Sequence, residues 1–376
     1  MAQDVYARLA DALDRLPNGF PRTESGVELA VLRKIATPEE ADLASRLSGT
    51  MEPTDAIAAR AGLAPAEARR ALMGLVRKGM AWFEREGGVN RFRLAPFIVG
   101  LYEAQLDVLD EELARLVEEY FAQGGAAGIM GPEPALHRVI PAQTAVEHEW
   151  VLPYDDVRAI MEGAKSFFVR DCICRTEQAL VGNPCRFPVH NCLSFTWREV
   201  PPGPESVTKE EALALLEETE RIGLVHTVSN VAEGIGYVCN CCGCCCGILR
   251  GITEFGLEQS VAKANYRAAI DADLCIGCGV CAERCHVDAI HEVGGVYAVI
   301  AERCIGCGLC VTGCSSEAVT LTRLPEAETV HPPSDFAAWE QERLRNRGLA
   351  DSVTHGPPAL ARTARSATAL DLGAQS

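Results

Sequence analysis

The sequence has no long apolar run and comparatively few positive charges. No stretch of about 18 consecutive apolar residues occurs, so we expect no membrane span. The 35 lysines and arginines are outnumbered by 52 aspartates and glutamates, which gives a formal charge of −17. Such an excess of acid disfavours a general coat on nucleic acid or on an anionic membrane. The first residues, Met1 to Asp4, also lack the basic and apolar regions of a secretory signal, so we expect a cytoplasmic protein.

Cysteine is absent from the first 171 and the last 62 residues, whereas the segment from Cys172 to Cys314 holds all 18. Because disulfides are disfavoured in a reducing cytosol, thiols gathered in this way indicate metal or redox chemistry. The chain has 376 residues, of which 48% are hydrophobic, and this is enough for roughly two to four domains with real cores. Global disorder is excluded. We expect an α+β multidomain protein.

The N-terminal third predicts a helical unit that ends in a hairpin. After a short helix within residues 1–22, residues 23–100 show three helical segments and then two strands that meet at Glu86-Gly87-Gly88. This order is typical of a winged helix-turn-helix. Eight basic residues between Arg60 and Arg93 outnumber three acidic ones, a local charge of +5 that would permit contact with phosphates. The alternative is a docking or dimerisation unit, which the acidity of the whole chain favours over DNA binding.

Three further segments have no cysteine. Residues 101–124 predict an acidic amphipathic helix, whose apolar stripe could pack within the chain or join two subunits in a homodimer. Residues 125–150 contain Gly-Pro-Glu-Pro, which is typical of a linker. Residues 326–376 are rich in Pro, Ala, Ser and Arg, and we expect a disordered tail there.

The strongest motif is a repeated cysteine spacing within residues 263–325. Three cysteines separated by two residues are followed, after three more residues, by a fourth, and the pattern occurs twice, as in bacterial ferredoxins. In that arrangement the fourth cysteine of each motif crosses to the other cluster. We therefore expect one 4Fe-4S cluster on Cys275, Cys278, Cys281 and Cys314, and a second on Cys304, Cys307, Cys310 and Cys285.

The residues around this motif carry two more observations. Glycines such as Gly277 and Gly306 let backbone N–H groups approach the sulfides of a cluster. The proline that usually follows the fourth cysteine is replaced by His286 and Ser315, and His286 would either donate a hydrogen bond to a cluster sulfur or be an exposed turn residue. A zinc ribbon would need two Cys-x2-Cys pairs at longer spacing and would leave ligands unused.

Residues 151–262 predict an α/β domain with ten further cysteines, six of them within the eight residues that follow a predicted strand. Adjacent cysteines do not readily form disulfides, and thiolates packed this densely repel one another unless a metal coordinates them. Ten ligands would serve two four-iron clusters with two thiols spare, or one larger iron–sulfur assembly, and the same thiolates would also bind zinc. The candidates are Cys172, Cys174, Cys185, Cys192, Cys239, Cys241, Cys242, Cys244, Cys245 and Cys246.

The order of these motifs carries a resemblance that covers about residues 23–325. It includes His137-Arg138-Val139-Ile140-Pro141, Asp171-Cys172-Ile173-Cys174-Arg175, Cys239-Asn240-Cys241-Cys242-Gly243-Cys244-Cys245-Cys246 and the two ferredoxin motifs. The chain resembles the large 4Fe-4S ferredoxin-type proteins of anaerobic and facultative bacteria. The resemblance implies iron–sulfur electron transfer beside partner oxidoreductases and supplies no substrate.

The sequence therefore favours an electron-transfer protein or subunit over a stand-alone enzyme. It would hold two 4Fe-4S clusters and one or two further iron–sulfur centres, and relay single electrons between a donor and a partner oxidoreductase or flavoprotein. One alternative is a reductase whose catalytic iron–sulfur centre lies in the middle domain, near His190, His226 or Arg175. The other is a redox-sensing transcription regulator that binds a specific duplex.

Overall fold

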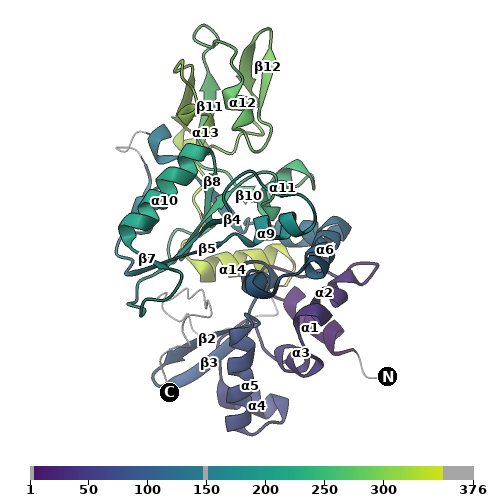
Figure 1. The fold of residues 1–376 in the computed structure, drawn as a ribbon. Helices are drawn as coiled ribbons and strands as arrows, with labels where there is room; N and C mark the ends of the chain where they lie inside the picture. The colour runs from purple at the N-terminus through teal and green to yellow at the C-terminus, as the bar shows by residue number, and fades with distance from the viewer. Residues whose placement is uncertain (1–3, 147–150, 350–376) are drawn as a thin grey trace.

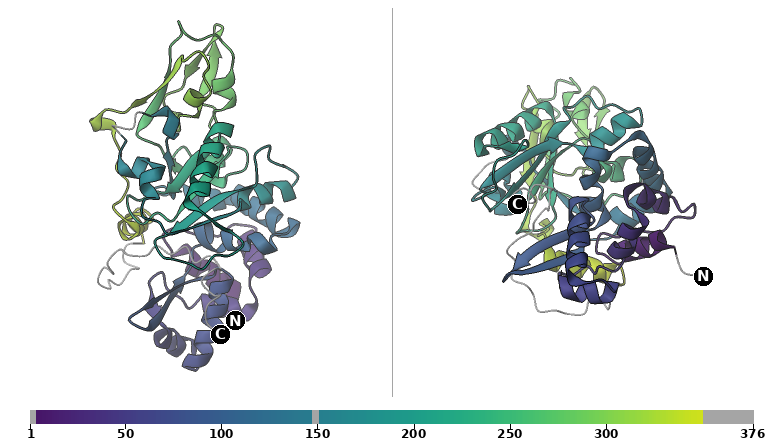
Figure 2. Two further views of the ribbon diagram at one scale, coloured as in Figure 1. Left: turned by 60° about the vertical axis from the view of Figure 1, so that its left-hand side comes forward. Right: turned by 60° about the horizontal axis from the view of Figure 1, so that its bottom comes forward.

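The structure, a computed structural model, describes residues 4–146 and 151–349. Its parts follow one another along a long axis, from an N-terminal helical unit through a central seven-stranded sheet to a small cysteine-bearing unit at the far end (Figures 1 and 2). One hydrophobic core runs from Tyr6 to Trp339 and joins the N-terminal unit to the central sheet. In the described part of the chain, no helix has the length and apolar character needed to cross a membrane.

Residues 5–94 form the N-terminal unit, in which helices pack beside a small antiparallel sheet. The predicted hairpin is confirmed, with Phe83 opposite Phe92. One helix that the sequence prediction lacked, α3, begins with a capping box between Thr37 and Glu40. The helices are α1 (Val5–Asp14), α2 (Val27–Ile35), α3 (Pro38–Ala44), α4 (Thr54–Ala61) and α5 (Pro65–Arg77), and the sheet, in the order β1-β3-β2, consists of β1 (Glu52–Pro53), β2 (Ala81–Glu86) and β3 (Val89–Leu94).

The central sheet has the strand order β10-β4-β8-β9-β6-β5-β7 and is antiparallel except between β10 and β4. Its strands are β4 (His137–Ile140), β5 (Ser166–Asp171), β6 (His190–Thr196), β7 (Ser206–Val207), β8 (Val225–Ser229), β9 (Tyr237–Cys241) and β10 (Val261–Ala262). The helices around it are α6 (Glu111–Tyr120), α7 (Ala126–Met130), α8 (Val157–Ile160), α9 (Ile173–Leu180), α10 (Lys209–Ile222) and α11 (Gly247–Thr253). Helix α10 covers one face, and α9 and α11 lie on the other (Figure 1). Thr208 and Glu211 form a capping box at the start of α10.

The prediction of a linker over residues 125–150 is wrong for the described residues up to 146. Helix α7 lies there, and β4 is an inner strand of the central sheet whose four residues are all buried. Two of the four are basic, and Arg138 is neutralised by a buried ion pair with Asp155. The sequence shows no apolar strand pattern here, because two of the four residues are basic. The acidic partner that lets Arg138 be buried lies outside the strand. Residues 147–150 lie outside the described residues.

The acidic helix predicted over residues 101–124 is interrupted. A short 3-10 segment, Glu103–Val108, ends before Leu109, and α6 then begins after Asp110, whose carboxylate accepts a hydrogen bond from the Leu113 N–H at 2.9 Å. The apolar stripe of α6 is buried in the common core. Glu118 of α6 also pairs with Arg250 of α11 at 2.7 Å. The helix therefore packs within the chain.

The prediction of a disordered tail over residues 326–376 is wrong for residues 326–349. They include a short 3-10 segment, Glu326–Glu328, and helix α14 (Phe336–Asn346), which returns between the central sheet and the N-terminal unit (Figure 1). Trp339 and Arg343 of this helix are buried. Leu344 is buried with them, so the helix is anchored although the segment shows little apolar periodicity. The rest of the predicted tail, residues 350–376, lies outside the described residues.

Residues 266–323 form the small unit at the far end, which we call the repeat unit. Its two halves each carry a short helix, and a two-stranded sheet of β11 and β14 joins the beginning of the unit to its end. Ile270 lies directly opposite Val319 in this sheet. The elements are β11 (Tyr266–Ile270), α12 (Val280–Glu283), β12 (Ile290–Val293), β13 (Val296–Val299), α13 (Leu309–Thr312) and β14 (Val319–Arg323).

Candidate metal centres

All 18 cysteines lie in the described part of the chain, and none of them forms a disulfide. Their contacts divide them into four groups. In the repeat unit we distinguish an outer set (Cys275, Cys278, Cys281, Cys314) and an inner set (Cys285, Cys304, Cys307, Cys310). In the middle domain we distinguish a four-thiol set (Cys185, Cys242, Cys244, Cys245) and a six-thiol set (Cys172, Cys174, Cys192, Cys239, Cys241, Cys246).

The outer set lines a single cavity at the far end of the repeat unit. The structure brings the fourth cysteine of the second motif, Cys314, to the three cysteines of the first. Gly277 has a positive φ of 69°, and a Cβ there would lie 2.4 Å from the carbonyl oxygen of Gly295. Only glycine therefore allows the loop to close over this cavity. Four thiols converging on one cavity are a donor set that fits a cubane cluster.

The inner set lies on the side of the repeat unit that faces the middle domain. Burial, together with the charges of Cys304 and Cys285, raises the pKa of the Cys310 thiol to about 12. The backbone N–H of Ala289 donates a hydrogen bond to the Cys285 sulfur at 3.2 Å. A metal that replaces the protons of these buried thiols leaves negatively charged sulfurs, and an N–H directed at a sulfur stabilises that charge. These surroundings fit a second cluster.

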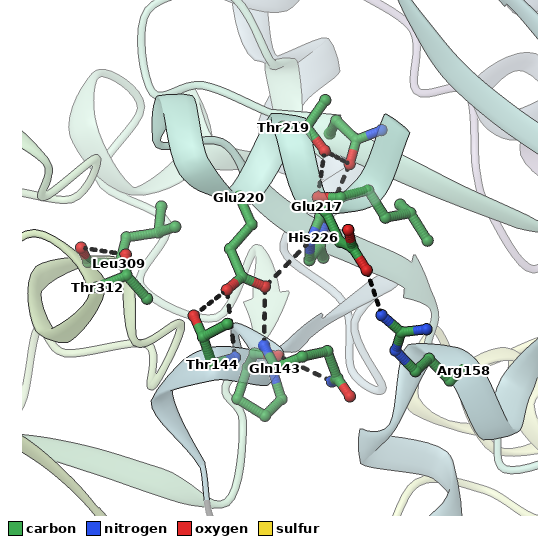
Figure 3. Close-up of polar contacts among 12 residues, drawn as sticks. Gln143, Thr144, Arg158, Glu217, Thr219, Glu220, His226, Leu309 and Thr312 are labelled. Atoms are coloured by element: carbon green, nitrogen blue, oxygen red, sulfur yellow. Dashed lines mark hydrogen bonds and ion pairs between the residues drawn. The ribbon is translucent and has the colours of Figure 1, made fainter. Parts of the chain in front are cut away.

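The inner set is fixed to the middle domain through the loop at residues 141–145. The backbone N–H of Ala142 donates to the Cys307 carbonyl oxygen at 2.9 Å. The next residues of the loop are held by Glu220 at the end of α10, which accepts hydrogen bonds from the N–H groups of Gln143 at 2.8 Å and Thr144 at 3.2 Å (Figure 3). Helix α13 lies beside this loop in the same view. The inner set is thus joined to the middle domain by direct hydrogen bonds.

His286, which follows Cys285 directly, makes the second link across this junction. Its Nδ1 accepts a hydrogen bond from the Gly243 N–H at 3.1 Å, and its Nε2 lies 2.6 Å from the Gly223 carbonyl oxygen. Because a carbonyl can only accept, Nε2 carries the proton and the imidazole is neutral. Burial also lowers the pKa of His286. The side chain therefore neither binds a cluster sulfur nor is an exposed turn residue, the two alternatives that the sequence left open.

The six-thiol set is organised by the central sheet. Leu193 of β6 lies opposite Val238 of β9, which brings Cys192 next to Cys239. Successive residues of a strand point to opposite faces, so Cys239 and Cys241 share one face of β9. Side-chain interactions then connect the thiols in an unbroken series, which runs from Cys192 through Cys239, Cys241, Cys246 and Cys174 to Cys172.

One member of the six-thiol set is poised to lose its proton. Interactions with Cys239 and Cys246 lower the pKa of Cys241 to about 5, against the opposing effect of burial. The hydroxyl of Thr227 contributes as well, since its Oγ1 lies 3.4 Å from the Cys241 sulfur. Sequence reasoning missed Thr227, although the pairing of β8 with β9 places it beside the thiol face. A thiolate among linked thiols is the donor chemistry of an iron–sulfur centre.

The four-thiol set lies in the turn after β9 together with Cys185 from the loop after α9. All four sulfurs lie within 4.8 Å of one another. The Cys185 sulfur is 3.6 Å from that of Cys242 and 3.7 Å from that of Cys244, and the sulfurs of Cys244 and Cys245 are also 3.7 Å apart. A hydrogen bond from Cys245 lowers the pKa of Cys242 to about 4, assisted by the nearby charge of Arg175.

Arg175 is a buried cation between the two middle-domain sets, with 1% of its surface exposed. Its guanidinium donates to the side-chain oxygen of Asn191 and to the carbonyl oxygen of Asn240, both at 2.8 Å, and these acceptors are neutral. Its Nε has no hydrogen-bond partner among the described residues. Although burial opposes its charge, the neighbouring Cys172, Cys242 and Cys241 raise its pKa. A buried guanidinium that pairs with no carboxylate of residues 4–146 and 151–349 fits negatively charged thiolate centres on both sides.

The two histidines predicted near the middle-domain centre lie elsewhere. His226 alternates with Thr227 on β8 and faces α10, where its Nε2 is 3.9 Å from a Glu220 carboxylate oxygen (Figure 3). Burial lowers its pKa. His190 is exposed, and its Nδ1 lies 2.8 Å from a carboxylate oxygen of Asp171. His226 reaches the thiol segment only through Asn240, whose side-chain oxygen lies 2.8 Å from its Nδ1. Of the three candidates, Arg175 is the one on which neighbouring thiols act directly.

Comparisons with known proteins agree with the geometry of the repeat unit. Residues 268–321 match a family described as a 4Fe-4S dicluster domain. This dicluster domain contains all eight cysteines of the outer and inner sets. The match does not extend to the middle domain or the N-terminal unit. Neither a curated protein nor a solved structure matches the chain. The chain thus contains an iron–sulfur domain of redox type, together with a separate cysteine-rich cluster around residues 241–245.

Proposed function

We propose that this chain is an iron–sulfur electron-transfer protein that relays single electrons between a redox partner and a centre in its middle domain. The outer and inner sets would each hold one 4Fe-4S cluster, and the six-thiol set a further iron–sulfur centre. Bound clusters of this kind supply one-electron chemistry. The protein supplies the cysteine ligands and their buried surroundings, and it places the outer set, the inner set and the six-thiol set one after another.

The hydrogen bond between His286 and Gly243 is the observation that carries this proposal. His286 is bonded to the inner ligand Cys285, and Gly243 is separated by Cys242 alone from Cys241 of the six-thiol set. One hydrogen bond of 3.1 Å therefore completes a path between the two ligand sets that is otherwise covalent. The outer and inner sets are adjacent as well, since Cys281 and Cys310 belong to one small apolar cluster.

The exposed end of the dicluster domain is suited to a partner protein. Cys278 of the outer set is exposed, and beside it Leu274 and Ile276 are 52% and 67% exposed. Exposed apolar side chains next to a redox site are typical of a transient docking surface. An oxidoreductase or flavoprotein that covers them would exclude water from the outer set. We propose this end as the place where electrons enter or leave.

The experiment is to follow reduction of the middle-domain centre in the intact chain by freeze-quench paramagnetic resonance after mixing with a low-potential donor. His286→Phe keeps a ring beside Phe187 but removes the acceptor for the Gly243 N–H. We expect reduction of the middle-domain centre to slow at least about tenfold, while the dicluster signals form at the normal rate. His291→Phe, on the exposed β12, is the matched control. Equal rates in all three proteins would contradict the proposed route.

For the N-terminal unit we propose a winged helix-turn-helix that serves docking rather than DNA binding. Half of its eight basic side chains are already paired with acids. Arg60 pairs with Glu52, Lys78 with Glu40, Arg91 with Glu86 and Arg93 with Glu340. Charges neutralised within the protein contribute little to phosphate binding. A specific complex with duplex DNA at physiological salt, lost in Arg69→Ala/Arg70→Ala, would favour the regulator instead.

One observation favours the reductase as a second candidate function. Glu177 is buried one helical turn after Cys174, and the hydroxyl of Tyr102 donates a hydrogen bond to it. Burial raises the pKa of Glu177 to about 8, so the carboxyl holds a proton at neutral pH. A neutral acid near the six-thiol set could supply protons to a bound substrate. Turnover of a small molecule by the isolated chain with a chemical reductant, abolished in Glu177→Gln, would support this reading.

A further inference from the structure

The ten middle-domain thiols are not interchangeable, because the strand geometry of β9 divides them. Cys239 and Cys241 lie on the strand and share a face, whereas Cys242, Cys244 and Cys245 belong to the turn that follows it. Cys246 precedes α11 and returns to the strand face, where it interacts with Cys241 and Cys174. The six cysteines within these eight residues therefore supply two different sites.

The sulfur separations of the four-thiol set match one metal ion rather than a cluster. In a tetrahedral site with metal–sulfur bonds of about 2.3 Å, the sulfurs lie about 3.8 Å apart. Three of the six separations are 3.6 Å, 3.7 Å and 3.7 Å, and all six are within 4.8 Å. A cubane binds each thiolate to a different iron and needs its four ligands further apart. The four-thiol set is thus already arranged for a single ion.

The surroundings of the four-thiol set supply what such an ion needs. The Phe187 N–H donates to the Cys185 sulfur at 3.5 Å, and the Arg175 guanidinium offsets the net negative charge of four thiolates. Cys242 and Cys245 are buried together with Phe187 and Leu224 in a small apolar cluster of their own. This cluster is separate from the core around the six-thiol set.

We propose that Cys185, Cys242, Cys244 and Cys245 bind a single tetrahedral metal ion, zinc or iron, at the junction between the middle domain and the dicluster domain. The inference rests on the proposed function in one respect: it assumes that the six-thiol set binds the further iron–sulfur cluster. The ion holds the turn that presents Gly243 to His286. A Cβ at Gly243 would lie 2.3 Å from the His286 carbonyl oxygen, so the two backbones touch at this point.

The test is a metal and acid-labile sulfide determination on the intact, anaerobically purified chain and on two variants. Cys185→Ala should remove about one metal ion per chain and no sulfide, because a single tetrahedral ion contains none. Cys239→Ala, from the six-thiol set, is the matched control and should remove iron and sulfide together. Retention of the dicluster paramagnetic signal shows that each variant is folded.

If Cys185→Ala does not fold, cobalt binding to the intact chain tests the same site. The intact chain expressed with Co²⁺ should take up about one ion and show the absorption of tetrahedral cobalt thiolate. Either zinc or iron at the site supports the inference, and the two differ only in whether the ion is redox-active. Loss of about four irons with sulfide in Cys185→Ala would overturn it in favour of a cubane and leave the electron-transfer proposal intact.

Discussion

At the scale of single residues, Arg175 controls the charge balance of the middle domain. It is the buried cation next to thiols of both middle-domain sets. We expect Arg175→Gln to lower the reduction potential of the middle-domain centre. A unit charge about 8 Å away is worth roughly 2 kcal/mol at an effective dielectric constant of about 20, which corresponds to on the order of 80 mV for one electron.

A redox titration monitored by paramagnetic resonance measures this shift. Arg221→Gln is the control, because Arg221 is exposed and pairs with Glu218 on the surface of α10. The dicluster potentials should stay unchanged in both variants. A middle-domain potential that does not move in Arg175→Gln would show that the guanidinium is compensated by a group other than the thiolate centres.

Glu177 predicts a pH dependence of stability. Burial raises its pKa from 4.5 to about 8 in the folded protein, so the folded state retains a proton that the unfolded chain loses above its ordinary pKa. Its contribution is therefore fully present below about pH 4.5 and declines as the pH rises to about 8. The decline should amount to on the order of 2 to 4 kcal/mol.

Urea denaturation of the anaerobic protein between about pH 5 and pH 8 measures this slope. Glu177→Gln should show a clearly shallower slope over the same range, because glutamine has no proton to lose; the slope that remains belongs to groups such as Glu103, whose pKa burial raises to about 7. Glu217→Gln, at an exposed position of α10, should keep the wild-type slope. A variant at position 177 with an unchanged slope would assign the pH dependence to other groups.

Part of the grouping of the cysteines could be predicted from the sequence. Spacing alone predicted which cysteines gather in the outer and inner sets, because three ligands come from one tight loop and the fourth from its counterpart. Spacing could not divide the ten others. Whether a thiol such as Cys246 joins Cys241 or Cys245 depends on where β9 ends, and that is set by pairing with β6 and β8.

At the scale of elements, α14 binds distant parts of the chain together. Arg343 donates hydrogen bonds to the carbonyl oxygens of Pro17 at 2.8 Å and Pro134 at 2.6 Å. We expect Arg343→Met to lower the free energy of unfolding by on the order of 3 kcal/mol, because buried carbonyls lose their charged donor. Thermal unfolding measures the loss. The exposed Arg345→Met should change stability by less than about 0.5 kcal/mol.

Elements with a strong local signal were predictable, and elements made by tertiary contact were not. Helix α10 carries its own capping box at Thr208 and a glycine stop at Gly223, and both are signals that lie within the local sequence. Strand β4 and helix α14 depend on buried arginines whose partners are remote carbonyls or a remote carboxylate. In the sequence such arginines look like the charges of a solvated loop. The reason is that the carboxylate or carbonyl groups that pair with these arginines are brought to them only by folding.

At the scale of the whole molecule, the dicluster domain is an insertion between two paired strands. Ile270 ends β11 directly opposite Val319 at the start of β14, so a short Asn-Gly turn can replace residues 271–318. This deletion keeps α14, which a truncation after residue 270 would remove. We expect the shortened chain to lose about eight irons and to retain the middle-domain metal, since the ligand sets do not share a cysteine.

Iron, zinc and sulfide analysis of the shortened chain checks this expectation, with circular dichroism to confirm folding. A folded protein without middle-domain metal would mean that a cysteine of the dicluster domain also ligates the middle-domain centre. The division of the ligands into separate sets would then be wrong. The transfer of electrons from a partner at the exposed end should be lost in the deletion in either case.

The central claim is that electrons reach metal beyond the two clusters of the dicluster domain. The most direct measurement is a coulometric reductive titration of the intact anaerobic protein, with iron and sulfide determined on the same sample. The account predicts clearly more than about two electrons and more than about eight irons per chain, with a further paramagnetic signal that Cys239→Ala removes. An uptake limited to about two electrons, with about eight irons and only zinc on the other thiols, would contradict it.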